Sequence, residues 1–170
     1  MTEAEASTQG APMRTTIKAG IILGILVEIW TVVVIAAGWH KDPALMAVFF
    51  LVIPIQITVI VMALKQTAAE APYAKQVLNG IAISLIAGAI IFAGSYLLTT
   101  AVFPTYFDEL RVAGAEILTK AGKSPEEIAV ELKKNESMYD PLQNSLAGLF
   151  GTSVTGLLVS MIAAIFVRKK

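Results

Sequence analysis

Four long, almost uncharged stretches constrain what this chain of 170 residues can fold into. They cover residues 17–38, 44–64, 77–102 and 146–167. An α-helix needs about 20 mainly apolar residues to cross a hydrocarbon core about 30 Å thick, and each stretch is that long. None of them alternates apolar and polar residues, which is the pattern of a transmembrane strand. The sequence therefore predicts an all-α fold, a bundle of four transmembrane helices in a lipid bilayer.

The segments between these stretches are short, with one exception. Residues 1–16 are small and polar and are expected to form a disordered tail, followed by one membrane domain over residues 17–170. Residues 104–145 carry two helical patterns, and the second opens with Ser124-Pro125-Glu126-Glu127, a capping box with proline at the first helical position. We expect an extramembrane helical hairpin here, between spans three and four, resting on the bundle mouth or on the membrane surface.

Composition excludes several kinds of site. The chain has no cysteine, so disulfides, thiolate catalysis and cysteine metal ligands are absent, and its formal net charge of zero gives no footprint for nucleic acid. His40 is the only histidine, and Asp42 is its only near neighbour able to bind a metal. The sequence shows no nucleophile–base pair and no Gly-rich phosphate loop. We therefore expect a non-enzymatic protein without a cofactor.

Glu28 is the only acidic residue within the four stretches, and its presence there argues against a cleaved signal peptide. At 1.5 Å per residue it lies about 16 Å into its span, and Gln56, Gly88 and Gly156 lie within about 4 Å of the same level. We predict an intramembrane polar site of Glu28 and Gln56, bordered by the two glycines. Two interpretations stay open: a protonatable site for coupled transport, or a protonated carboxyl that hydrogen-bonds a neighbouring helix and fixes its packing.

Small residues recur every four positions in three of the stretches and predict close helix packing. They are Gly20 and Gly24 in the first, Gly80, Ser84 and Gly88 in the third, and Gly148, Thr152, Gly156 and Ser160 in the fourth. The row in the fourth stretch favours association with a second copy of the chain or with another membrane protein. In the second stretch, Pro54 predicts a kink, because proline removes a backbone donor.

Basic residues near the span ends predict the orientation in the membrane. One side holds most of them, at positions 14, 18, 65, 75 and 168–170. The other side holds Lys41 and the segment 104–145, which is richer in acidic than in basic residues. The positive-inside rule then places both termini in the cytoplasm and the hairpin outside.

The carboxy-terminal half carries a recognisable pattern. It consists of Gly122-Lys123-Ser124-Pro125-Glu126-Glu127-Ile128, then Asp140-Pro141, then Gly151-Thr152 and the run from Gly156 to Lys170. Together with the apolar, Gly-rich first span and the four-span layout, this pattern resembles the bacterial membrane proteins grouped as domain of unknown function 4199. The resemblance implies a small bacterial integral membrane protein, and it carries over no activity, cofactor or binding residue. We expect the protein in the bacterial cytoplasmic membrane.

Two functional hypotheses stay open. The first is a membrane protein that acts through helix–helix association, as a homo-oligomer or as an assembly subunit. The second is a small proton-coupled carrier or channel that uses Glu28.

Overall fold

The computed structural model describes the backbone of residues 3–68 and 71–167, and every regular element in these ranges is helical. The α-helices are α1 (Glu3–Ala36), α2 (Val52–Thr67), α3 (Tyr73–Leu97), α4 (Tyr106–Lys120), α5 (Pro125–Lys134) and α6 (Pro141–Val167). Three 3₁₀ segments, η1 (Trp39–Lys41), η2 (Met46–Leu51) and η4 (Glu136–Tyr139), and one π-helical segment, η3 (Leu98–Val102), connect or extend them. The predicted all-α class is confirmed.

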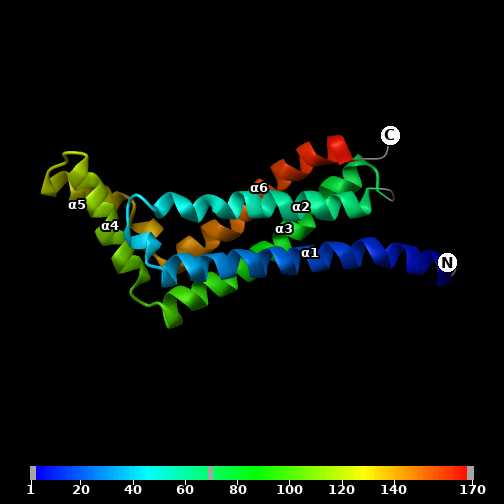
Figure 1. The fold of residues 1–170 in the computed structure, drawn as a ribbon, viewed down its shortest axis with the longest axis horizontal. Helices are drawn as coiled ribbons and strands as arrows, with labels where there is room; N and C mark the ends of the chain where they lie inside the picture. The colour runs from blue at the N-terminus through cyan, green and yellow to red at the C-terminus, as the bar shows by residue number, and fades with distance from the viewer. Residues whose placement is uncertain (1–2, 69–70, 168–170) are drawn as a thin grey trace.

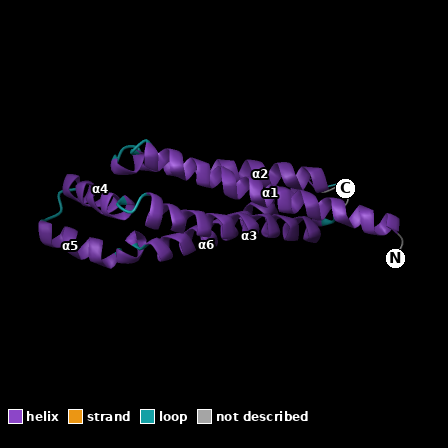
Figure 2. Cartoon of the chain, turned by 90° about the horizontal axis from the view of Figure 1, so that it is seen from below, coloured by secondary structure: helices purple, strands orange, loops and turns teal. Residues whose placement is uncertain are grey.

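Four helical segments are long and apolar enough to cross a membrane: Met13–Ala36, Met46–Thr67, Tyr73–Val102 and Pro141–Val167. The chain is therefore a multi-pass membrane protein, and the predicted four-helix layout is confirmed. The four long helices run side by side, with α4 and α5 at one end (Figures 1 and 2). The start of α1 and the end of α6 lie at the opposite end (Figure 1). We call the two ends the hairpin end and the terminal end.

Helix α1 begins at Glu3, so it includes most of the residues that the sequence analysis assigns to a disordered tail. Alanine and glutamate in the segment Glu3–Ala6 favour helix. The apolar turns further along α1 supply the nucleus, and adding one residue to an existing helix forms one hydrogen bond without a new nucleation step. Composition alone, which suggests disorder, does not include this effect.

Helices α3 and α6 pack antiparallel through two copies of the motif Gly-x-x-x-Ser. A Cβ atom built on Gly80 would overlap the side chain of Ser160, and one built on Gly156 would overlap that of Ser84. Each serine hydroxyl donates a hydrogen bond to the glycine carbonyl four residues earlier in its own helix. Both serines are therefore fully buried with satisfied hydroxyls, each against the glycine of the opposite helix. We call these four residues the Gly–Ser seam.

The same helix pair stays close toward the hairpin end. A Cβ atom on Gly88 would lie 3.2 Å from the Leu149 carbonyl oxygen, and one on Gly148 would lie 3.4 Å from Ile91 Cγ2. Four of the predicted packing glycines, two on each helix, thus line one continuous contact. The glycines of the predicted row on the fourth span therefore pack against α3 of the same chain.

Helix α1 packs parallel to α3 through its own glycines. A Cβ atom on Gly20 would lie 2.9 Å from the Ile83 carbonyl oxygen, and one on Gly24 would lie 2.8 Å from Ile90 Cβ. Helix α2 completes the bundle by packing between α1 and α6. Figure 2 shows the result, with α1 and α2 along one side and α3 and α6 along the other. The core lies at the centre, where Leu23, Ile60 and Ile83 are almost completely buried.

Pro54 changes the winding of the second span. The span begins as the 3₁₀ segment η2, and the α-helical part starts at Val52, which places Pro54 in the first turn of α2. The preceding turn is itself helical, and the Val52 amide donates to the Phe49 carbonyl across the junction. Because proline has no amide hydrogen, Pro54 leaves one carbonyl at this junction without a donor. The position for which the sequence analysis predicts a kink is a transition between two helix types.

The hairpin forms where its sequence signals predict it. Ser124 accepts a hydrogen bond from the Glu127 amide, and the Glu127 carboxylate accepts one from the Ser124 amide, which completes the capping box of α5. Gly122, with φ of 79°, ends α4 in the left-handed conformation, and the Gly122 and Lys123 amides donate to the last carbonyls of α4. The segment Asp140–Pro141 begins α6, whereas α5 has already ended at Lys134.

We predict that Gly156→Ala destabilises the bundle and that Gly151→Ala does not. Both changes gain about 1 kcal/mol of helix propensity. A methyl group at Gly156 would collide with Ser84, whereas one at Gly151 would meet no atom within 4 Å. Overpacking costs about 1–3 kcal/mol, so thermal unfolding in detergent followed by circular dichroism should show a lower Tm for Gly156→Ala only. Equal Tm values for the two variants would contradict the seam.

Candidate functional site

Glu28 lies inside the membrane-spanning part of α1 and faces α3. Its Oε1 atom accepts a hydrogen bond of 2.9 Å from the Ser95 hydroxyl. A Cβ atom on Gly94 would lie only 2.6 Å from Glu28 Cδ, so the carboxyl group occupies the space that this glycine leaves open. Gly20, Gly24 and Glu28 thus follow one line along α1 and all contact α3.

The second carboxyl oxygen of Glu28, Oε2, is buried and has no hydrogen-bond partner in the described part of the chain. An unsatisfied polar atom in a membrane interior costs free energy, and the cost is larger for a charged group than for a neutral one. Membrane proteins retain such groups mostly at functional sites.

The helix around Ser95 is irregular. Thr99 donates from its hydroxyl to the Ser95 carbonyl at 2.8 Å, and the π-helical segment η3 begins just before Thr99. Single π turns occur frequently at functional sites.

Gln56, the second predicted polar residue, makes a different contact. Its Nε2 atom donates a hydrogen bond of 2.6 Å to the Thr152 carbonyl oxygen of α6. That carbonyl is accessible because Gly156, one turn further along, has no side chain to cover it: a Cβ atom there would lie 3.3 Å from Gln56 Nε2. The amide therefore fixes α2 against α6, next to the Gly–Ser seam.

The structure does not bring Glu28 together with the three residues predicted at its level. Glu28 contacts Ser95 and Gly94, Gln56 and Gly156 lie together at the α2–α6 contact, and Gly88 packs against Leu149. Matching depth is not sufficient for contact, because each helix turns one narrow face toward each neighbour. The predicted polar site is two separate contacts, one on each side of the bundle.

A third polar cluster lies at the hairpin end, outside the spans. Glu109 of α4 accepts a hydrogen bond of 2.8 Å from His40 Nε2 and forms an ion pair of 3.0 Å with Lys41. Thr105 donates a further bond to it at 3.2 Å, and the Tyr106 ring lies 5.0 Å from the His40 ring. His40 is 3 % exposed, so this cluster joins the loop after the first span to the start of the hairpin.

Protonation at this cluster follows from its contacts. The hydrogen bonds from His40 and Lys41 hold the pKa of the Glu109 carboxyl below its ordinary value. Burial raises the pKa of Tyr106 to about 12, so its hydroxyl is neutral over the physiological range. Glu109 is therefore an anion that accepts three hydrogen bonds, and it holds the hairpin to the bundle.

The described residues contain no group of three histidine, aspartate or glutamate side chains placed to hold a metal ion. The three polar arrangements described above are hydrogen-bonded contacts between helical segments. One membrane carboxyl, Glu28, has a free oxygen, and one anion, Glu109, holds the hairpin.

Comparison with known proteins identifies the family. The family model described as "Protein of unknown function (DUF4199)" matches residues 18–169, almost the whole chain. The chain is a DUF4199 protein. No match was found among curated proteins or among solved structures. The resemblance stated from the sequence is confirmed. Because the DUF4199 family is described as one of unknown function, the match assigns no activity to the polar contacts described above.

Sequence reasoning did not find the partners of the polar residues in this DUF4199 protein. Glu28 accepts a hydrogen bond from Ser95 and fills the space beside Gly94. Gln56 donates to a backbone carbonyl. Glu109, the partner of His40, lies 69 residues away in the sequence. One signal was available for the first contact: Gly20, Gly24 and Glu28 share a face, so a helix that packs on the glycines also reaches the carboxyl. No signal in a single sequence identifies Glu109 as the partner of His40.

We predict that Glu109→Gln lowers the stability of this DUF4199 protein at neutral pH and has a smaller effect in acid. Because its pKa is lowered in the folded state, Glu109 contributes stability above the ordinary carboxyl pKa of 4.5, and this contribution is lost as the pH falls through the folded value. The expected loss at pH 7 is about 1 kcal/mol or less. Thermal unfolding at pH 7 and at low pH measures it.

The control for this prediction is Asp108→Asn. Asp108 is the adjacent residue, its side chain is 80 % exposed, and its only described ion pair is a 3.8 Å contact with Arg111. This variant should unfold like the unmodified protein at both pH values. A Tm difference for Glu109→Gln that stays the same at both pH values would contradict the assignment.

Proposed function

We propose that this DUF4199 protein is a non-enzymatic membrane protein that acts through helix–helix association, as a homo-oligomer or as a subunit of a larger membrane assembly. The observation that supports this function is an unfilled row of small residues on the outer face of α6. Gly151 is exposed, and a Cβ atom there would meet no atom within 4 Å. Ala147 and Thr155 lie one turn before and after it on the same face.

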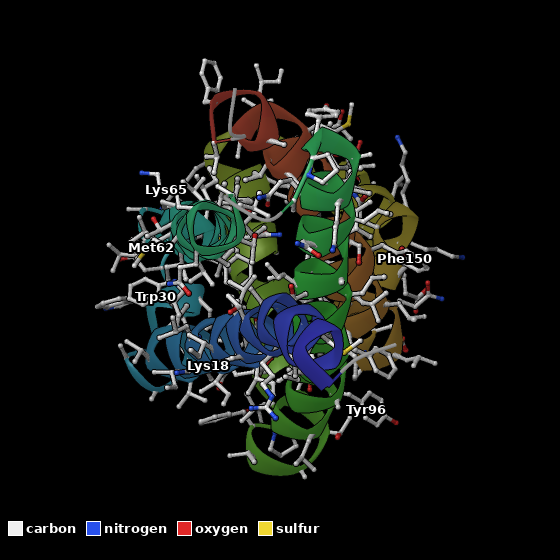
Figure 3. All side chains as sticks on the ribbon, turned by 90° about the vertical axis from the view of Figure 1, so that its right-hand side faces the viewer. Lys18, Trp30, Met62, Lys65, Tyr96 and Phe150 are labelled. Carbon is white, nitrogen blue, oxygen red and sulfur yellow. The ribbon has the colours of Figure 1, made fainter. Side chains whose placement is uncertain are left out.

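This outer row differs from the inner row that the sequence analysis emphasises. The inner row, which includes Gly148, Gly156 and Ser160, is covered by α3. Small residues on a membrane-facing surface let a second helix approach closely, and van der Waals contact then replaces contact with lipid. Phe150, beside the row, is 63 % exposed and points away from the bundle (Figure 3).

Association should depend on the outer row. We predict that the unmodified protein in mild detergent has a mass above that of the 18.1 kDa chain plus its detergent. Gly151→Leu should reduce this mass to that of the monomer, because the new side chain occupies the space that a partner helix needs. Light scattering coupled to size-exclusion chromatography measures the mass.

The matched control is Ala89→Leu, a small-to-large change on an exposed position of α3. It should leave the mass unchanged. A monomer in the unmodified protein, or equal loss of association in both variants, would contradict the proposal.

A second function is favoured by one specific observation, the buried and unpaired oxygen of Glu28. A carboxyl held in a helix contact, with one oxygen bound to Ser95 and the other free, can take up and release a proton. Ser95 of α3 and Thr99 of η3 continue the polar line toward the hairpin end. The alternative function is therefore a small proton-coupled carrier or channel.

Glu28→Gln tests this alternative, since glutamine retains the shape and hydrogen-bonding capacity of glutamate and cannot titrate. In proteoliposomes with a pH-sensitive dye inside, the unmodified protein should support proton flux and Glu28→Gln should reduce it at least tenfold. The control is Glu127→Gln, the same substitution on the exposed hairpin, and it should leave the flux unchanged. A change at Gln56 is not suitable, because Gln56 holds α2 against α6. Flux that persists in Glu28→Gln would remove Glu28 from the mechanism.

We further propose that the protein lies in the bacterial cytoplasmic membrane with its terminal end in the cytoplasm. Basic residues at that end, among them Arg14, Lys18, Lys65 and Lys75, support this orientation. The chain has no cysteine, so Val130→Cys, 66 % exposed on α5, gives one reporter. In intact spheroplasts a membrane-impermeant maleimide should label it, and labelling only after lysis would reverse the orientation.

A further inference from the structure

A crevice of about 600 Å³ lies between α1 and α2 in the terminal half of the bundle. Helix α1 lines it with Arg14, Lys18, Ile22 and Leu26, which share one face because they are four residues apart. The crevice is therefore polar and cationic at the membrane surface and apolar further in. This order along the helix matches that of a phospholipid, whose charged headgroup lies at the surface and whose chains lie in the hydrocarbon.

The opposite wall of the crevice shows the same gradient. Helix α2 runs antiparallel to α1 and contributes Gln66 near the surface and Met62 and Val59 further in. Thr58 lines the innermost part, and its hydroxyl donates to the Pro54 carbonyl of its own helix. Met62 is 57 % exposed, so the crevice opens toward the lipid. Figure 3 shows Lys18 and Met62 on the same side of the bundle, with Lys65 next to Met62.

The crevice also has the depth of one membrane leaflet. From Lys18 to Leu26 is eight residues, about 12 Å along the helix axis. Half of a hydrocarbon core of about 30 Å is about 15 Å. An acyl chain whose headgroup is bound at Lys18 would thus stay in contact with the crevice over most of its leaflet.

Charge identifies the class of headgroup. Among the side chains that the structure describes, those of residues 13–68 and 71–167, none that is acidic lines the crevice, and none forms an ion pair with Arg14 or Lys18. Two adjacent unpaired cations at a membrane surface attract anionic lipid, and basic pockets between transmembrane helices are known to hold such headgroups. A zwitterionic headgroup would leave this charge uncompensated.

We propose that this crevice binds one anionic phospholipid, with its phosphate between Arg14 and Lys18 and one acyl chain along Ile22, Leu26 and Met62. The lipid is a specific ligand of the bundle. It fills the gap between α1 and α2 on the surface that faces the membrane.

Native mass spectrometry of the full chain in detergent, titrated with phosphatidylglycerol or with phosphatidylcholine, tests the proposal. Phosphatidylglycerol should add one lipid mass at lower concentration than phosphatidylcholine. Lys18→Gln should weaken its binding about fivefold, the expected effect of one surface cation. Lys75→Gln removes one charge at the same end of the bundle but outside the crevice, and it should leave binding unchanged.

A second variant tests the apolar part and keeps the proposal testable if Lys18→Gln is unstable. Ile22→Trp retains both cations and fills the crevice, so it should weaken phosphatidylglycerol binding at least tenfold. Glycerol phosphate, which has the headgroup without chains, should not bind the unmodified protein at the concentrations at which the lipid does.

Several results would overturn the proposal. Equal binding of the two lipids would remove the role of charge, and equal effects of Lys18→Gln and Lys75→Gln would remove the site. Unchanged binding in Ile22→Trp, or binding of glycerol phosphate as strong as that of the lipid, would remove the acyl chain. A second chain that displaces the lipid in the spectra would assign the crevice to a protein partner.

Discussion

The Gly–Ser seam between α3 and α6 is the contact on which the rest of this structure depends. Lipid tails are as apolar as leucine, so burial of apolar side chains gives membrane helices little reason to associate. Close approach of the two backbones stabilises the association instead. Each helix has one glycine, which leaves a space, and one serine, which fills the space on the opposite helix. The serine hydroxyls bond within their own helices, so the seam gains contact without an unpaired polar group.

Other contacts follow from the position of these two helices. Gly156 exposes the Thr152 carbonyl, and Gln56 bonds to it, which places α2. Helix α3 also receives α1, and at Gly94 the pattern reverses: the space is on α3, and the larger residue, Glu28, is on α1. The interior of the bundle is therefore filled by pairs of small and large residues. The proposed functions and the proposed lipid site use Glu28 Oε2, which is unpaired among the described residues, and two outer surfaces, the open row of α6 and the cationic crevice between α1 and α2.

Much of the fold could be predicted from the sequence because its signals are local. Twenty or more apolar residues specify a span, and Ser124 with Glu127, or Gly122 after α4, specify a helix end through hydrogen bonds between near neighbours. The contacts between helices were harder to predict from the sequence. Glycine at every fourth position shows that a helix will approach, but not which helix, so the row of Gly148 and Gly156 was equally compatible with a second copy of the chain. Glu28 and Gln56 lie at similar depths and still contact different helices, because the rotation of each helix decides its partner. The sequence contains no local signal for that rotation.

The close antiparallel approach of α3 and α6 can be tested directly with a disulfide, because the chain contains no cysteine of its own. Gly148 and Ile91 face each other, with 3.4 Å between a Cβ built on the first and Cγ2 of the second. Ile91 Cγ2 is bonded to Ile91 Cβ, and no other Ile91 atom lies within 4 Å, so the two Cβ atoms are about 4–5 Å apart. This separation is close to the 3.5–4.5 Å of a disulfide. The double variant Ile91→Cys/Gly148→Cys, oxidised in membranes and examined by mass spectrometry of its peptides, should form the intramolecular bond almost completely. Leu85→Cys/Gly148→Cys, with Leu85 51 % exposed on α3, should not form it. Equal crosslinking of the two pairs, or crosslinks only between chains, would contradict the seam and the bundle built on it.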